Sequence, residues 1–196
     1  PVITLADSDG ARIAEGAYAI RGYGDVIKRT IALSDHVPQI TLACGLCVGA
    51  AAYNAALTDF TAMVQDQSFM FITGARVTRA MTGEEVDIAD LGGDALHART
   101  TGACHAVLES EGAGIEWVKR LLSYVQQPVL ASDDPPQRVC EKIAMLLPES
   151  DRAAYNMKPL LEDIFDTGSM LELSEEYAPN LLTYMARLNG RAVVVL

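Results

Sequence analysis

Residues 39–60 read QITLACGLCVGAAAYNAALTDF, and this stretch decides the predicted fold. Gln39 to Ala43 predicts a short buried strand. The small residues from Cys44 to Gly49 predict a tight turn, and Ala50 to Leu57 is helix-prone. A strand that leads through such a turn into a helix is typical of an α/β layer fold.

The first residues of the chain show the same arrangement. Pro1 to Ala6 predicts a buried strand, and the turn Asp7-Ser8-Asp9-Gly10 follows it. Apolar residues then recur at helical spacing between Glu15 and Ser34, which predicts a helix. Both turns therefore place small residues just before a helix. Backbone N–H groups at such positions are free to bind an anion.

Strands and helices continue to alternate along the chain. Further strands are predicted over 60–64, 69–73, 170–173, 181–188 and 191–196, and helices over 74–81, 139–147 and 160–165. The spacing of Ile115, Val118, Leu122 and Val125 predicts another, amphipathic helix. Thr82-Gly83-Glu84-Glu85 has the pattern of a capping box for a short helix.

Composition excludes several classes of protein. The chain has 196 residues and a formal net charge of −11, with 15 Lys and Arg against 26 Asp and Glu, which argues against nucleic-acid binding. Its apolar runs are too short to cross a bilayer, and no secretory signal is visible. Four cysteines in a chain of this length do not make a disulfide scaffold, so a reducing cytoplasm is expected.

Both ends of the chain have the pattern of core strands, namely Pro1 to Ala6 and Arg191 to Leu196. Natural termini seldom lie inside core strands, so we expect a segment of a larger protein. Two unpaired strand edges predict poor stability for such a segment in isolation.

Side-chain catalysis has little support in the sequence, which contains no GxSxG, Walker or HExxH motif. Cys44 and Cys47 form a CxxC, but the other two cysteines, Cys104 and Cys140, are isolated. A zinc site or a redox motif is therefore a weaker interpretation than two small residues in a turn. The three histidines form no ligand pattern, and we expect each to be structural or exposed; they are His36, His97 and His105.

Backbone chemistry remains as a candidate mechanism. Gly10 and the pair Gly49-Ala50 could supply N–H donors to an oxyanion, which contributes several kcal/mol of transition-state stabilisation. The alternative for these residues is ordinary helix-start geometry with close packing. Asp7 and Asp9 could form a carboxylate pair, although capping a helix is the better interpretation.

Motifs along nearly the whole chain resemble one known family, the carboxyltransferase (β) subunits of biotin-dependent acyl-CoA carboxylases of the propionyl-CoA or acetyl-CoA type. Residues 7–13, DSDGARI, resemble the family's DSGGARI, and residues 45–53, GLCVGAAAY, are similar to GPCAGGAVY. Further matching stretches follow in family order: ALTDF at 56–60, MFITG at 70–74, TGEEV at 82–86, LGG at 91–93 and DDPP at 133–136.

The resemblance implies a fold and a domain organisation. The fold expected is an α/β, crotonase-like (ClpP/crotonase) fold, present in the family as N- and C-domains. Residues 1–130 would be the later part of the N-domain. Residues 131–196 would be the linker and the beginning of the C-domain, and the proline-rich stretch from Gln126 to Gln137 is consistent with a linker.

The resemblance also implies an activity. Family members move a carboxyl group from carboxybiotin to the α-carbon of an acyl-CoA, through an enolate held in backbone oxyanion holes. The N-domain hole maps to Gly49 and Ala50, with Asp9 and Gly10 beside it. The implied cofactor is biotin on a carrier protein, with acyl-CoA as substrate and no metal in this segment. The implied partners are a biotin carboxylase and biotin carboxyl carrier subunit, and further copies of the complete subunit in a hexamer; nucleic acid and membrane are not among them.

Three departures from the family's pattern bear on activity. Asp9 stands where the family has glycine, Gly49-Ala50 stands where the family often has Gly-Gly, and Asn54-Ala55 replaces the usual Ser-Pro. Two alternatives therefore stay open beside the carboxylase. One is a biotin-dependent acyl-CoA decarboxylase subunit, and the other is a non-catalytic paralogue that only assembles with an active subunit. The Asp9 carboxylate motivates the second, because it could repel a developing anion.

Overall fold

The computed structural model describes residues 1–126, 129–135, 137–150 and 152–196. They form two compact units, which are considered separately. The first comprises Pro1–Val118 with Ser174–Ala178, and the second comprises Lys119–Leu173 with Pro179–Leu196. The predicted linker includes residues 127, 128 and 136, which lie outside the described residues. The expected domain boundary at residue 130 stays a prediction.

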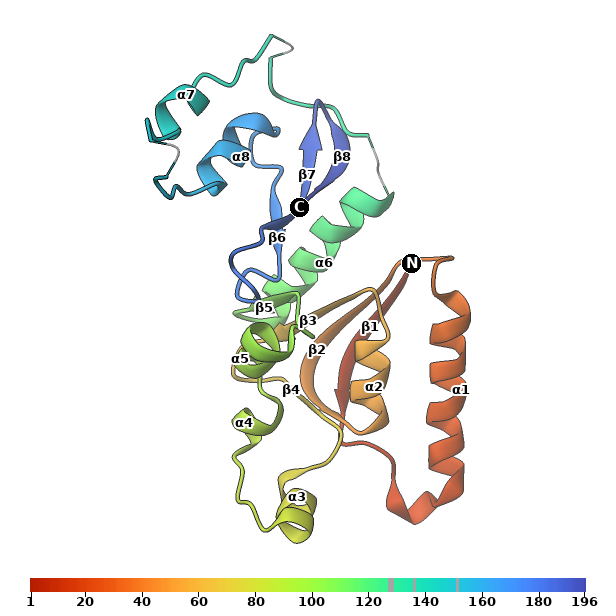
Figure 1. The fold of residues 1–196 in the computed structure, drawn as a ribbon. Coiled ribbons are helices and arrows are strands. Elements are labelled where there is room, and N and C mark those ends of the chain that lie inside the picture. The colour runs from red at the N-terminus through yellow and green to blue at the C-terminus, as the bar shows by residue number, and fades with distance from the viewer. Residues whose placement is uncertain (127–128, 136, 151) are drawn as a thin grey trace. The chain divides into compact units, whose positions relative to one another are not determined.

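A parallel sheet forms the centre of the first unit (Figure 1). Its strands are β1 (Val2–Ser8), β2 (Gln39–Val48), β3 (Phe60–Val64) and β5 (Ala106–Leu108), hydrogen-bonded in that order. A short strand, β4 (Phe69–Phe71), pairs with the end of β2. The predicted strands in this half of the chain are therefore present, in the α/β arrangement that their alternation with helices indicated.

Helices cover both faces of this sheet. Ala52 and Ala55 of α2 (Ala50–Ala56) belong to one buried cluster with Ala43 of β2. On the opposite face, the neighbouring Leu42 meets Gly114, in the first part of α6 (Glu111–Gln126). Adjacent strand residues point to opposite faces, so β2 contacts both helix layers.

The helix α1 (Ala17–Leu33) packs beside α2 (Figure 1) and is also hydrogen-bonded to the sheet, through Tyr23 to Ser8 of β1 and through Thr30 to Gln39 of β2. Thr30 Oγ1 of α1 donates a hydrogen bond to Asn54 Oδ1 of α2 at 2.7 Å. The remaining elements of the unit are short: η1 (Ile13–Glu15), α3 (Ala75–Thr82), α4 (Ile88–Gly92), α5 (Asp94–Leu96) and the π-helical η2 (His97–Thr101).

Two strand expectations are wrong in part. β1 is not buried, because it is an edge of the described sheet and pairs only with β2; Leu5 is 61% exposed. The predicted turn from Cys44 to Gly49 is mostly strand. β2 continues to Val48 because its end finds new partners in β4 and in Ser8.

Three helix expectations also need correction. Thr82–Glu85 does not start a helix; α4 begins at Ile88, where the Asp87 side chain accepts the N–H of Ala89. The predicted helix is present as α6, but only part of its predicted apolar stripe is buried: Val118 is 4% exposed, whereas Ile115 is 41% and Val125 37% exposed. The most buried positions are Gly114, Trp117, Val118, Leu121 and Tyr124. The helix predicted over 139–147 is limited to α7 (Ile143–Leu146).

The second unit contains a three-stranded antiparallel sheet of β6 (Leu171–Leu173), β7 (Thr183–Leu188) and β8 (Arg191–Val195). The last part of α6, α7 and α8 (Lys158–Ile164) complete it. The Asp166 carboxylate accepts the N–H groups of Asn189 at 2.8 Å and Gly190 at 2.6 Å, in the β7–β8 turn. Gly190 must lack a side chain, because a Cβ there would lie 1.8 Å from the carbonyl oxygen of Leu130.

Among the described residues, no helix has the length and apolar character needed to cross a membrane.

Gly114 offers a test of the contact between α6 and the sheet. A Cβ at Gly114 would lie 2.7 Å from Leu42 Cδ2, and Leu42 is fully buried and cannot move aside. We expect Gly114→Ala to lower the free energy of unfolding by about 1–3 kcal/mol, measured by urea denaturation. Gly112→Ala is the matched control on the same helix, since the nearest atom to its Cβ is 3.8 Å away. Equal effects of the two substitutions would contradict the close contact.

Candidate functional site

The register between β1 and β2 brings two turns together. Ser8, the last residue of β1, pairs with Cys47, the penultimate residue of β2. The chain then leaves β1 through Asp9-Gly10 and leaves β2 through Gly49-Ala50. Because the strands are parallel, both turns lie at the carboxyl edge of the sheet, where α/β proteins bind their ligands.

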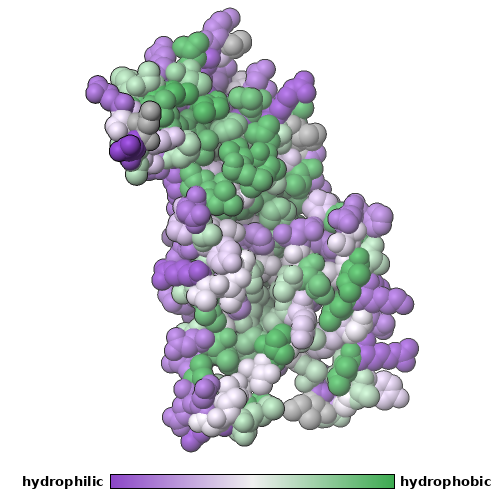
Figure 2. Space-filling model, viewed as in Figure 1, coloured by the Kyte–Doolittle hydropathy of each residue, from purple (hydrophilic) through white to green (hydrophobic). Residues whose placement is uncertain are grey.

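One cavity of about 450 Å³ is lined by all four predicted site residues, Asp9, Gly10, Gly49 and Ala50. Six further residues complete its wall: Ala11, Ile20, Tyr23, Gly24, Ile27 and Val48. Figure 2 shows this part of the molecule hollowed beside α1, with apolar residues along the helix. The volume falls in the range of small-molecule sites, which are mostly apolar with a few polar groups.

Glycine is required at two of these positions by backbone conformation. Gly10 has φ +94° and lies against β2; a Cβ would be 3.4 Å from the carbonyl oxygen of Val48. Gly49 has φ 61° and ψ −119°, a region that residues with a side chain rarely adopt. Asp9 is not among the residues with positive φ, so its backbone has no need of glycine. In this chain Gly10 alone of the two residues Asp9 and Gly10 has the positive φ that favours glycine.

The N–H groups at the site are not equally available. The Gly49 N–H donates to the Phe71 carbonyl at 2.9 Å, and the Gly10 N–H donates to Ser8 Oγ at 3.3 Å. Ala50 is the first residue of α2, and an N–H at this position has no acceptor within its own helix. Of Gly10, Gly49 and Ala50, Ala50 is therefore the residue whose N–H finds no acceptor within its own helix, while Gly49 shapes the turn.

Cys44 and Cys47 are poorly suited to metal or redox chemistry. Burial, and secondarily the nearby Asp7 charge, raises the pKa of Cys47 to about 11, and burial raises the pKa of Cys44. A raised pKa disfavours the thiolate, which is the form that binds metals and attacks disulfides. Within the described part of the chain, no three side chains of His, Cys, Asp or Glu are grouped to hold a metal ion.

The histidines have the structural and exposed roles that the sequence predicted. His97 Nε2 bonds the Met70 carbonyl at 2.7 Å, and His97 Nδ1 bonds Thr101 Oγ1 at 2.9 Å. His105 Nδ1 accepts the N–H of Thr61 at 3.0 Å, which joins β5 to β3. His36 is exposed.

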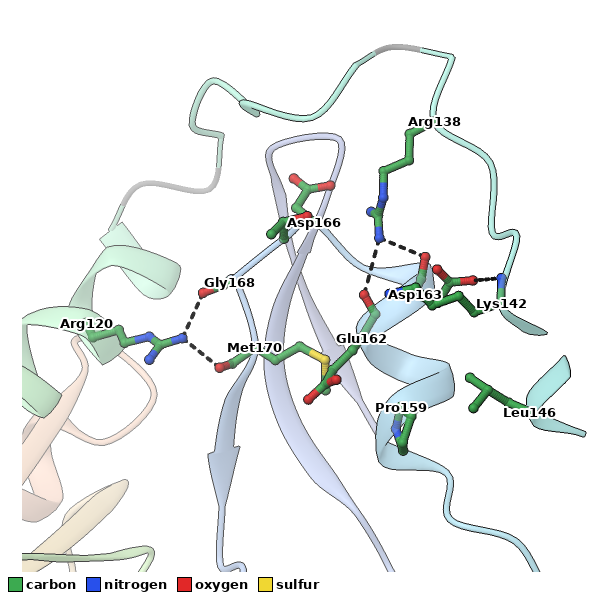
Figure 3. Close-up of a pocket in the computed structure, with 11 residues that line it drawn as sticks. Arg120, Arg138, Lys142, Leu146, Pro159, Glu162, Asp163, Asp166, Gly168 and Met170 are labelled. Carbon is green, nitrogen blue, oxygen red and sulfur yellow. Dashed lines mark hydrogen bonds between the residues drawn. The ribbon is translucent and has the colours of Figure 1, made fainter.

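A second cavity, about 730 Å³, lies within the second unit (Figure 3). Its arginine side chains donate hydrogen bonds to backbone carbonyls of this chain. Arg120 donates to the carbonyls of Gly168 and Met170. Arg138 donates to the carbonyls of Phe165, Glu162 and Asp163. These contacts give the cavity a structural explanation, so the first cavity is the better candidate site.

Sequence reasoning did not assign α1 to the site, although Ile20, Tyr23, Gly24 and Ile27 all line the first cavity. Their spacing of three and four residues places them on one helix face. This spacing is visible in the sequence, but by itself it predicts only a helix. The position of that helix face beside Gly49 and Ala50 is known only from the folded structure.

Comparison with known proteins agrees with this geometry. The carboxyl transferase domain family matches residues 1–196. The chain belongs to the carboxyl transferase domain family.

Individual relatives include a propionyl-CoA carboxylase carboxyltransferase subunit from Haloferax mediterranei, 39% identical over 98% of this chain and 39% of the relative. A methylmalonyl-CoA decarboxylase subunit alpha from Propionigenium modestum is 38% identical over 100% of this chain and 39% of the relative. This member of the carboxyl transferase family thus spans about two fifths of the length of these relatives.

A solved structure of transcarboxylase 12S, a hexamer with methylmalonyl-coenzyme A and methylmalonic acid bound, has a TM-score of 0.92 and 36% identity. The match covers 98% of this chain and 38% of that one. The crotonase-like fold expected for the carboxyl transferase domain is confirmed by this likeness.

His105 predicts a pH dependence of stability. Burial lowers its pKa below the ordinary histidine value of about 6.5, because the protonated ring would lose its hydration in the buried site. The unfolded chain then binds more protons as pH falls below about 6.5, so acidification destabilises the folded state. We expect the urea midpoint to fall between about pH 7 and pH 5.5, and His105→Gln to reduce that slope. His36→Gln, at an exposed histidine, is the control; an identical slope in both variants would contradict the prediction.

Proposed function

We propose that the polypeptide carrying this chain is the carboxyltransferase component of an acyl-CoA carboxylase. It would move a carboxyl group from carboxybiotin to the α-carbon of a short acyl-CoA, such as propionyl-CoA or acetyl-CoA. One observation carries the proposal: in a chain of the carboxyl transferase family, the turns Asp9-Gly10 and Gly49-Ala50 meet at one largely apolar cavity. The propionyl-CoA carboxylase relatives support the same substrate class.

The cavity suits a thioester that becomes an enolate. Biotin, bound to a partner protein, would supply CO2 and accept the α-proton on its ureido nitrogen. The Ala50 N–H, at the start of α2, would donate to the thioester oxygen as negative charge grows on it. Gly49 and Gly10 would let the backbone turn close to that oxygen, and the apolar wall would contact the acyl chain. No side-chain nucleophile is needed for this chemistry.

Assembly forms part of the proposal. The transcarboxylase 12S structure, which resembles this chain, is described as a hexamer with a bound acyl-CoA. We infer that the complete subunit forms a homo-oligomer of this kind. It would work with a biotin carboxylase and biotin carboxyl carrier, without nucleic acid or membrane as a partner.

A decarboxylase subunit remains the second candidate. The methylmalonyl-CoA decarboxylase relative is 38% identical and the carboxylase relative 39%, so identity does not separate the two. Both would use the same cavity in opposite directions. The protein partners decide between them: a biotin carboxylase indicates carboxylation, and a membrane sodium pump indicates decarboxylation.

The reverse transfer tests the function directly. The longest natural polypeptide that contains this chain would be given malonyl-CoA or methylmalonyl-CoA with free biotin. The bond between the α-carbon and the carboxylate breaks, the α-carbon takes the ureido proton, and a nitrogen–carboxyl bond forms on biotin. We expect biotin-dependent loss of the carboxyl group. Acyl-CoA binding without any biotin-dependent turnover would support the non-catalytic paralogue instead.

Asp9 should reduce the rate of this reaction. Its carboxylate lines the cavity in which an enolate would form, and like charges repel. Because Asp9 is exposed, solvent screens the effect, and we expect Asp9→Gly to raise kcat about threefold to tenfold. Asp9→Asn keeps the size of the side chain and removes its charge, so it should raise kcat similarly. A rate unchanged in both variants would remove the argument that Asp9 impairs catalysis.

A further inference from the structure

The helix α1 contains two glycines whose small size is not explained by packing against the described chain. Gly22 and Gly24 lie inside α1, where each costs about 1 kcal/mol of helix stability relative to alanine. A Cβ at either position would have no atom of the described chain within 4 Å. Their small size is therefore not required by a neighbouring side chain.

The two glycines border different spaces. Gly24 lines the cavity of Gly49 and Ala50. Gly22 lines a separate hollow, also about 450 Å³, beside Arg12, Glu15 and Tyr18. Tyr23 lines both spaces, and its hydroxyl bonds Ser8 Oγ at 2.7 Å. The bond ties α1 to the end of β1, so the width of the first cavity at Gly24 is held by a specific contact.

The chemistry of the cavity at Gly24 suits an alkyl group. Ile20 and Ile27 lie four residues before and three residues after Gly24, on the same helix face, and both line the cavity. Ala50, the first residue of α2, lines the same cavity and would offer its N–H there. A ligand with a hydrogen-bond acceptor next to a short alkyl chain would satisfy both parts of the wall, and an acyl thioester has this structure.

We propose that Gly24 determines the longest acyl group that the enzyme accepts. The alkyl chain on the α-carbon lies over the bare backbone of α1 at Gly24, between Ile20 and Ile27. A side chain at Gly24 occupies that space and restricts the site to smaller acyl groups. This inference rests on the proposed carboxyltransferase function and assigns acyl-chain selection to α1.

Substitutions at Gly24 test acyl-chain selection separately from the proposed carboxyltransferase function. The full-length protein would be assayed by reverse transfer to free biotin with malonyl-, methylmalonyl- and ethylmalonyl-CoA, which differ by one carbon at the α-position. In Gly24→Leu, we expect kcat/KM for ethylmalonyl-CoA to fall at least tenfold relative to malonyl-CoA, with methylmalonyl-CoA in between. Gly24→Ala should shift the ratio in the same direction by a smaller factor. It also provides a readout should leucine disturb the fold.

Gly22→Leu is the matched control, because Gly22 lies on the same helix, in open space, but borders the other hollow. It should leave the substrate ratio unchanged. A ratio unchanged in both Gly24 variants, or changed equally by Gly22→Leu, would overturn the inference. If the unsubstituted protein turned over none of the three CoA thioesters with biotin, the proposed function would be overturned, and this inference with it.

Discussion

The parallel pairing of β1 with β2 is the constraint on which the candidate site depends. The two strands run in register from Val2 opposite Gln39 to Ala6 opposite Ala43. The register then shifts, so that Ser8 meets Cys47. This shift brings the turn at Gly10 against Val48 and places Gly49 beside it. Without this register, two unrelated glycine turns would lie at the ends of separate strands. With it, they form the wall of one cavity.

The start of β2, the helix α2 and the positions of the turns at Gly10 and Gly49 were predictable from sequence, because their signals are local. Small residues, positive φ and the start of a helix all act within a few residues of Gly49. What failed depends on distant partners. The extension of β2 beyond Ala43 needs β4, and the exposure of β1 follows from its edge position. The buried stripe of α6 was only partly predicted, because the spacing of apolar residues gives no signal for the contact of Gly114 with Leu42 of the sheet.

The proposed backbone chemistry would account for a sequence without GxSxG, Walker or HExxH motifs. An oxyanion hole built from N–H groups requires small residues and turns rather than particular side chains. Histidine and cysteine side chains of the same unit have structural roles. His97 and His105 bond the backbone, and the raised pKa of Cys47 keeps its thiol protonated. Function in such a chain is therefore visible in glycine conformation and in strand register.

The departures from the family's sequence pattern lie around the same cavity. Asp9 and Ala50 line it, and Asn54 accepts the bond from Thr30 that ties α1 to α2, the two helices beside it. Ala55 replaces a proline of the family within α2; it is buried, and its carbonyl accepts the hydroxyls of Thr58 and Thr61. The β1–β2 register depends on none of these positions, since it is set by the pairing of Val2–Ser8 with Gln39–Cys47. The named departures therefore alter the charge of the cavity and the contacts of the helices beside it, and leave the strand pairing that builds the cavity unchanged.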